Sequence, residues 1–208
     1  MSRFTPQSRL LIVANPAVGG AAAARFPPLT DTANEIEAAR AAFRAALLLE
    51  GHQATAAALI AGLPESDIVH FAGHGYATSE DGALLLAAGN PSQNYELLRS
   101  MDLSRQDWSR CRLVVLSACA AAAGEAHGAH NPDSLVRALS RAGAANVAAS
   151  LWSVDSAATS ELMKAFYAAL AAGSSPAHAL RQAQQTIRRR AEWSHPYYWA
   201  GFQLYATT

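Results

Sequence analysis

The chain has 208 residues, of which 51% are hydrophobic and 15% charged, a size and composition that suit one domain, residues 1–208, with a sizeable core. Sixteen basic residues balance sixteen acidic ones, and a net charge of zero argues against a binder of nucleic acid or anionic membranes. Cys111 and Cys119 are too few for a disulfide scaffold, and with no secretory signal or membrane-length apolar run they predict a cytoplasmic protein.

Short apolar runs alternate with helical stretches in the N-terminal half. In chain order we expect a strand at 10–15, a Gly/Ala/Pro loop to about residue 29, a helix that Asp31 or Thr32 caps, a strand at 46–49, a helix from Thr55 to Leu63, a strand at 67–75 leading into a glycine turn, and a hairpin strand at 82–89.

The C-terminal half continues this alternation. We expect an irregular stretch at 90–110 with a possible helix, a strand at 112–119, a loop at 120–131, a helix from Pro132 or Asp133 to about Gly143, a strand at 146–152, helices from Ser156 to Gly173 and from Pro176 to about Glu192, and a last strand at 199–206. Because the strands are continuously apolar and alternate with helices, the pattern predicts an α/β fold with a mostly parallel sheet covered on both faces.

Reactive side chains follow the strongest strands. His74 ends the third strand, Cys119 ends the strand at 112–119, and Trp152 and Asp155 follow the strand at 146–152. The carboxyl ends of parallel strands meet at one edge of a sheet, which is where sites gather in such folds. A thiol and an imidazole on neighbouring strands satisfy the requirement of a nucleophilic pair, in which the imidazole deprotonates the thiol and later protonates the leaving amine.

Glycines flank the histidine. Gly73 and Gly75 allow a tight turn with exposed backbone around His74. The backbone amides of Gly75 and Cys119 are candidates for the two donors that stabilise a tetrahedral oxyanion.

Four motifs together resemble the CHAT domain, a bacterial caspase-like protease domain related to separase and the caspases. They are HFAGHG (70–75), LVVLSAC (113–119), GAANVAASLWSVDSAAT (143–159) and HPYYWAGFQLYA (195–206). The resemblance extends over nearly the whole chain, from LLIVANP at 10–16 to the final strand.

The resemblance implies a caspase-like three-layer α/β/α sandwich, with His74 matching the family's catalytic histidine and Cys119 its catalytic cysteine. It implies a cysteine endopeptidase that acts on proteins, under an activating or sensor partner, and it suggests bacterial defence or cell death. Asp155 falls near the position where separase-like relatives place an acid for a basic P1 side chain. We therefore expect Asp155, Trp152 and Ser150 to bind substrate, although Asp155 is equally suited to capping the next helix.

Two other function classes remain as alternatives. A catalytically silent interaction module would use the same fold to dock partners. A nucleotide-binding domain is disfavoured, because neither GxGxxG nor GxxxxGK[ST] follows a strand. We expect no metal or other cofactor, since His127 and His130 lack the spacing and carboxylates of a metal site.

The remaining thiol and strand histidine have structural interpretations. Cys111 has no partner motif and is expected to be structural, and His70, inside an apolar run, is expected to be a hydrogen-bonded core residue. The loop at 120–131 contains neither Lys nor Arg. If P1 is basic, this loop offers no site for self-cleavage, and we expect the chain to work unprocessed.

Overall fold

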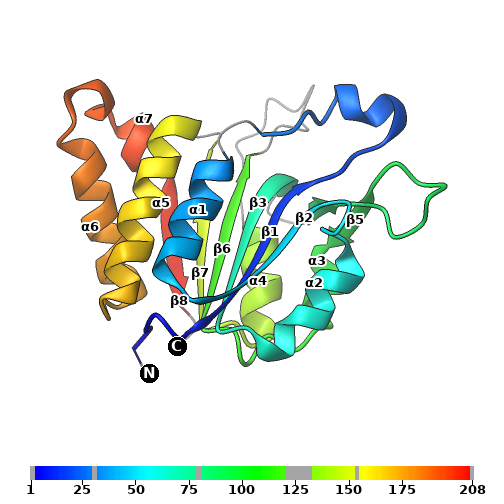
Figure 1. The fold of residues 1–208 in the computed structure, drawn as a ribbon, viewed down its shortest axis with the longest axis horizontal. Coiled ribbons are helices and arrows are strands. Elements are labelled where there is room, and N and C mark those ends of the chain that lie inside the picture. Colours follow the sequence, from blue (N-terminus) through cyan, green and yellow to red (C-terminus); the bar gives the residue numbers. More distant parts are fainter. Residues whose placement is uncertain (1–2, 30–31, 78–80, 120–132, 153–154, 207–208) are drawn as a thin grey trace.

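A mixed sheet with helices on both faces makes up the described part of the chain (Figure 1). The computed structural model describes residues 3–29, 32–77, 81–119, 133–152 and 155–206. Its strands are β1 (Arg9–Pro16), β2 (Ala45–Gly51), β3 (Ile68–Ala77), β4 (Gly82–Leu86), β5 (Glu96–Arg99), β6 (Leu113–Cys119), β7 (Asn146–Ser150) and β8 (Phe202–Ala206). The helices are α1 (Thr32–Ala42), α2 (Ala56–Gly62), α3 (Ser100–Ser104), α4 (Asp133–Arg141), α5 (Ser156–Ala171), α6 (Pro176–Arg188) and α7 (Pro196–Trp199), with short 3₁₀ turns at Gly20–Ala24, Leu63–Glu65 and Ala191–Trp193.

The strand order places β3 and β6 at the centre of the sheet. The order is β2-β1-β3-β6-β7-β8, with β4 added to β3 and β5 to β4. Pairing is parallel from β2 to β7 and antiparallel for β8 and for the β4–β5 hairpin. The parallel strands therefore end at one edge, the upper one in Figure 1, while both chain termini lie at the opposite edge.

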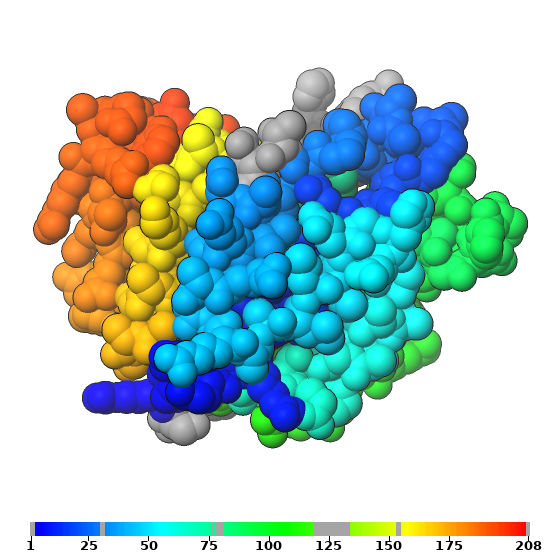
Figure 2. Space-filling view, in the orientation of Figure 1, coloured from blue at the N-terminus to red at the C-terminus, as the bar shows by residue number. Residues whose placement is uncertain are grey.

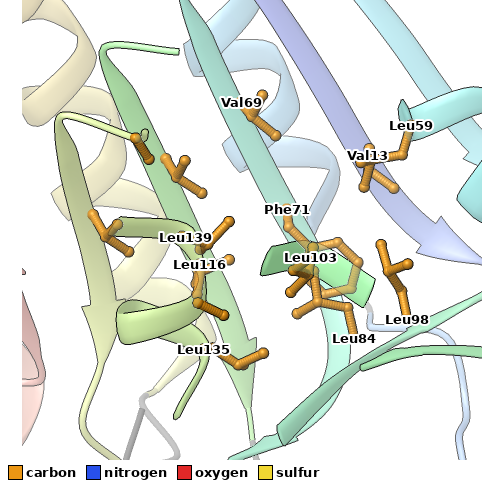
Figure 3. Close-up of a cluster of buried hydrophobic side chains, with 14 of the residues drawn as sticks. Val13, Leu59, Val69, Phe71, Leu84, Leu98, Leu103, Leu116, Leu135 and Leu139 are labelled. Atoms are coloured by element: carbon orange, nitrogen blue, oxygen red, sulfur yellow. The ribbon is translucent and has the colours of Figure 1, made fainter. Parts of the chain in front are cut away.

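Three layers result, because helices cover the sheet on each side. Helices α1, α5 and α6 pack on one face, where the buried residues include Ile36, Phe43, Phe166 and Leu180, and Figure 2 shows α1 beside α5 on that face. Helices α2, α3 and α4 pack on the other face. Figure 3 shows that second cluster, with Leu59, Leu103, Leu135 and Leu139 from the helices against Val69, Phe71 and Leu116 from the strands. The expected mostly parallel α/β/α sandwich is confirmed.

Three details differ from the sequence-based expectation. A strand, β5, lies inside the stretch expected to be irregular, and the helix α7 lies before the last strand, which begins at Phe202 rather than at residue 199. Both elements have only four residues, too few for a periodic pattern to stand out. The expected glycine turn at Gly73 and Gly75 is wrong, since β3 continues through both residues to Ala77.

Helix caps follow the sequence closely. Thr55 accepts a hydrogen bond from the backbone N–H of Ala58 at the start of α2, and Ser175 accepts one from the backbone N–H of His178 at the start of α6.

None of the helices in the described ranges is long and apolar enough to cross a membrane. The loop expected at 120–131, with His127 and His130, lies outside the described residues.

Candidate active site

The register between β3 and β6 brings His74 and Cys119 together. Ile68 of β3 pairs with Leu113 of β6, and the pairing continues without a shift until His74 pairs with Cys119. The two residues are 45 positions apart in the chain (119 − 74) and become neighbours because the two central strands start at the same level and run in the same direction. Adjacent strands lie about 4.8 Å apart.

The His74 ring is held from one side by a backbone carbonyl. Its Nε2 lies 2.7 Å from the carbonyl oxygen of Pro27, and its ring contacts the Phe26 ring with centroids 5.6 Å apart. A carbonyl only accepts hydrogen bonds, so Nε2 carries the hydrogen in the neutral ring and Nδ1 presents a lone pair.

The other ring nitrogen of His74, Nδ1, is buried and is free to accept a proton or a hydrogen bond. The residue is 5% exposed, and Nδ1 has no hydrogen-bond partner among the described residues. A buried imidazole nitrogen without a partner is costly, and such exceptions are often found where a group awaits a substrate or another reacting atom. The arrangement gives a proton acceptor next to the register position of Cys119.

Close packing, and not a turn, explains the two glycines of HFAGHG. A Cβ on Gly75 would lie 2.9 Å from the carbonyl oxygen of Ala83 in β4, and one on Gly73 would lie 3.0 Å from the Phe71 ring and 3.1 Å from Pro16. Side chains at these positions would push β4 and the end of β1 away from β3. Gly75 directly follows His74 and thus lies one residue beyond the His74–Cys119 register pair.

Ser150, Trp152 and Asp155 lie at or just beyond the end of β7 and each has a structural contact. The Ser150 hydroxyl is 2% exposed and donates to the carbonyl of Ala118, the residue before Cys119, at 3.1 Å. The Trp152 indole donates to the carbonyl of Tyr197 at 3.2 Å. Asp155 caps α5, since its Oδ1 accepts from the backbone N–H of Ala158 at 2.9 Å. In this conformation Ser150 fastens the end of β6 to β7 and is closed off from solvent.

The family profile of the CHAT domain matches residues 2–207 of this chain, almost its entire length. The chain belongs to the CHAT domain family. Among curated proteins, tetratricopeptide repeat protein 28 of Mus musculus is 36% identical over 110 residues, and that of Homo sapiens is 41% identical over 70 residues. The matches cover 51% and 34% of this chain but only 4% and 3% of those much longer proteins.

Solved structures similar to this CHAT domain include a cysteine proteinase and a separase. The Arg-specific cysteine proteinase gingipain R superimposes with a TM-score of 0.56 at 12% identity, covering 99% of this chain and 49% of the other. The Saccharomyces cerevisiae separase in its securin complex superimposes with a TM-score of 0.56 at 14% identity, covering 99% of this chain and 12% of the other. At these identities the likeness concerns the fold, and it confirms the caspase-like sandwich.

A buried polar network lies below the His74–Cys119 pair in the CHAT domain. Ser117, two residues before Cys119, donates its hydroxyl to the Glu35 carboxylate of α1, with oxygen–oxygen distances of 2.8 and 3.2 Å. His70 Nε2 lies 3.8 Å from the same carboxylate, and its Nδ1 lies 2.6 Å from the hydroxyl of Tyr167 in α5. The expectation that His70 is a hydrogen-bonded core residue is confirmed. Sequence reasoning missed Glu35, which resembled an ordinary first-turn acid favoured by the helix dipole.

The Cys111 thiol is unsuited to nucleophilic attack. Cys111 is 1% exposed and donates to the carbonyl of Leu113 at 3.2 Å. Burial raises the pKa of this thiol to about 12, so it stays protonated at neutral pH. Among the described residues, no three His, Cys, Asp or Glu side chains gather as a metal site would need.

Proposed function

We propose that this CHAT domain is a cysteine endopeptidase in which Cys119 is the nucleophile and His74 the general base and acid. The surroundings of His74 carry the proposal. His74 is the register partner of Cys119, its Nε2 is hydrogen-bonded to the Pro27 carbonyl, and its Nδ1 has no partner among the described residues. Residues opposite each other in paired strands share a face of the sheet, so these two backbone positions suit a nucleophile and its base.

The proposed reaction runs through a thioester. The Cys119 thiol gives its proton to His74 Nδ1 as sulfur attacks the scissile carbonyl carbon, which forms a C–S bond and an oxyanion. The intermediate collapses, the C–N bond breaks, and His74 passes the proton to the leaving amine. Water then attacks the thioester while His74 takes its proton. The C–S bond breaks, the acid product leaves, and that proton returns to the sulfur of Cys119.

Backbone donors and the end of β7 complete the proposed site. The amides of Gly75 and Cys119 are proposed to stabilise the oxyanion, because Cys119 is one member of the register pair and Gly75 directly follows the other. Asp155 and Trp152 are proposed to bind the substrate next to the scissile bond. A carboxylate favours a basic P1 residue, arginine above all, through a bidentate contact.

The proposed peptidase activity is proposed to be regulated by a protein or domain outside this one. The matched segment is a small part of the tetratricopeptide repeat proteins to which it is similar, so related domains occur within longer chains. We propose an activating or sensor partner, and a role in the bacterial cytoplasm, in defence or cell death.

A covalent thiol probe with intact-mass detection tests the proposal. We expect stoichiometric labelling of Cys119 at pH 7 and loss of proteolysis in Cys119→Ala and His74→Ala, with both variants folded, because members of such a pair act as a unit. Cys111→Ser is the matched control and is expected to retain activity, since its thiol is buried and protonated.

Two outcomes would contradict the peptidase. Labelling of Cys119 that does not depend on His74, with no cleavage of any member of a peptide library, would favour the interaction module. Equal loss of activity in Cys111→Ser, with an unchanged thermal melt, would mean that the wrong thiol has been assigned.

A further inference from the structure

Asn15 occupies a special backbone position where β1 ends. Its φ is 40°, a left-handed conformation, and the pairing of β1 with β2 shifts between Ala14 and Pro16. Left-handed backbone is disfavoured for most side chains but tolerated by asparagine, aspartate and glycine. The bulge turns Asn15 out of the regular strand pattern at the same edge of the sheet as His74.

The Asn15 side chain makes a two-point hydrogen-bonded clamp on Leu29. Its Nδ2 donates to the Leu29 carbonyl at 3.0 Å, and its Oδ1 accepts from the Leu29 N–H at 2.9 Å. The Thr32 hydroxyl donates to the same Leu29 carbonyl at 2.9 Å. The Leu29 N–H therefore has its acceptor in Asn15, whereas the carbonyl has two donors.

The clamped residue belongs to the short segment that holds His74. We call residues 26–29 the strap. Phe26 packs its ring against His74 and against Tyr95, each with centroids 5.6 Å apart, and Pro27 accepts the hydrogen bond from His74 Nε2. The strap is thus fixed at one end by aromatic packing and at the other by Asn15.

We propose that Asn15 is a positioning residue of the active site: it fixes the strap, and through the Pro27 carbonyl it fixes the tautomer and orientation of His74. The catalytic meaning of this role rests on the proposed peptidase function. Asparagine combines a donor, an acceptor and tolerance of a left-handed backbone in one short side chain. Aspartate keeps the acceptor but lacks the donor, and glycine keeps only the backbone tolerance.

The first test reads the His74 ring directly and needs no enzymatic activity. Long-range ¹⁵N–¹H correlation spectra of histidine-labelled protein report which ring nitrogen carries the hydrogen. We expect a single Nε2–H tautomer in the wild type, and a mixture of tautomers in Asn15→Gly, which keeps the left-handed backbone without the clamp. An unchanged tautomer and unchanged ¹⁵N shifts in Asn15→Gly would overturn the proposal.

The second test measures the alkylation rate of Cys119 by iodoacetamide from pH 5 to 9. We expect Asn15→Gly and Asn15→Asp to lower the rate at pH 7 by about 10–100-fold, because small misplacements of a catalytic group are costly. Asn146→Asp is the matched control. Asn146, the first residue of β7, donates its Nδ2 to the carbonyl of Arg112 at 2.9 Å, at the edge of the sheet opposite His74. We expect Asn146→Asp to leave the pH profile of Cys119 alkylation unchanged.

The outcomes separate the two proposals. If Cys119 reacts equally fast in wild type and His74→Ala, the peptidase proposal fails, while the tautomer measurement still decides the role of Asn15. If His74→Ala slows alkylation but Asn15→Gly does not, or if Asn146→Asp slows it as much as Asn15→Gly, the positioning role is overturned.

Discussion

Asp155 combines an observed role with a proposed one. Its carboxylate caps α5 through Ala158, and in our proposal it also pairs with a basic P1 residue. Asparagine caps helices about as well as aspartate, so Asp155→Asn removes the charge and keeps the cap. We expect it to lower kcat/KM for arginine-P1 peptides roughly 100-fold and to spare peptides with an uncharged P1. An enzyme that prefers aspartate or small apolar P1 residues from the start would contradict the pocket role.

The buried thiol of Cys111 is expected to lower the free energy of unfolding as the pH becomes alkaline. Burial raises the pKa of this thiol to about 12 in the folded protein, above the ~8.5 of an exposed cysteine. The folded state therefore holds this proton more tightly, and the resulting stabilisation is present below about pH 8.5 and is lost as pH rises towards 12. Urea unfolding from pH 8 to 11 should show a steeper loss of stability in the wild type than in Cys111→Ala. Parallel slopes in the two proteins would contradict this account.

At the scale of elements, the network below the site joins two helices to the central strands. The Tyr167 hydroxyl of α5 lies 2.6 Å from His70 Nδ1, and Ser117 of β6 donates its hydroxyl to the Glu35 carboxylate of α1. His70 Nε2 lies 3.8 Å from that carboxylate, beyond hydrogen-bond distance. Burial, and then the charge of Glu35, raises the pKa of the Tyr167 phenol, so it remains a donor at neutral pH. The network fastens α1 and α5 to the strands that carry His74 and Cys119.

Removing one hydroxyl tests that network. Tyr167→Phe keeps the ring but leaves His70 Nδ1 buried without a partner, and we expect a loss of about 1–3 kcal/mol in unfolding free energy. Tyr198→Phe, on a partly buried ring that contacts Tyr197, is the control and is expected to change it by less than about 0.5 kcal/mol. Equal denaturation midpoints for the two variants would show that the buried hydrogen bond contributes nothing.

The long strand β3 is the element that links the parts of the site. Along its first residues it pairs with β1 and β6, and from Gly75 it pairs with β4. Figure 3 shows how Leu84 of β4 and Leu98 of β5 join the cluster around Phe71, which anchors the hairpin beside the site. Glycine at 75 permits this pairing, because the carbonyl of Ala83 occupies the space of a side chain.

At the scale of the whole molecule, the chain is predicted to work without internal cleavage. The segment between Cys119 and the next helix carries no Lys or Arg at 120–131, and Arg137 lies within α4, where the backbone is already hydrogen-bonded. Incubation of active protein at high concentration, followed by intact mass, should show a single species. A cut between Cys119 and Arg137 that disappears in Cys119→Ala would contradict both this prediction and the basic P1 preference.

The amino-acid sequence was enough to predict the layered fold, the family and the candidate pair His74 and Cys119. Continuous apolar strands and capped helices are local patterns, and the motifs HFAGHG and LVVLSAC lie within the two central strands, β3 and β6. Two short elements, β5 and α7, were not predicted from the sequence, because each has too few residues to show a hydrophobic period. The prediction of a turn at Gly73 and Gly75 was wrong for another reason: glycine is found at positions of close packing as well as in turns.

The contacts that hold the candidate site were not predictable from the sequence and are seen in the folded chain. Pro27 meets His74 across 47 residues of sequence, and Ser117 meets Glu35 across 82. Asn15, which itself has a left-handed backbone at a bulge, accepts a hydrogen bond from the N–H of Leu29. Such contacts depend on strand register and on the path of one connecting segment, and a carbonyl or a single carboxylate has no sequence pattern that announces its distant partner. The residues that we propose to react are visible in the motifs, whereas the residues that orient them emerge when the sheet assembles.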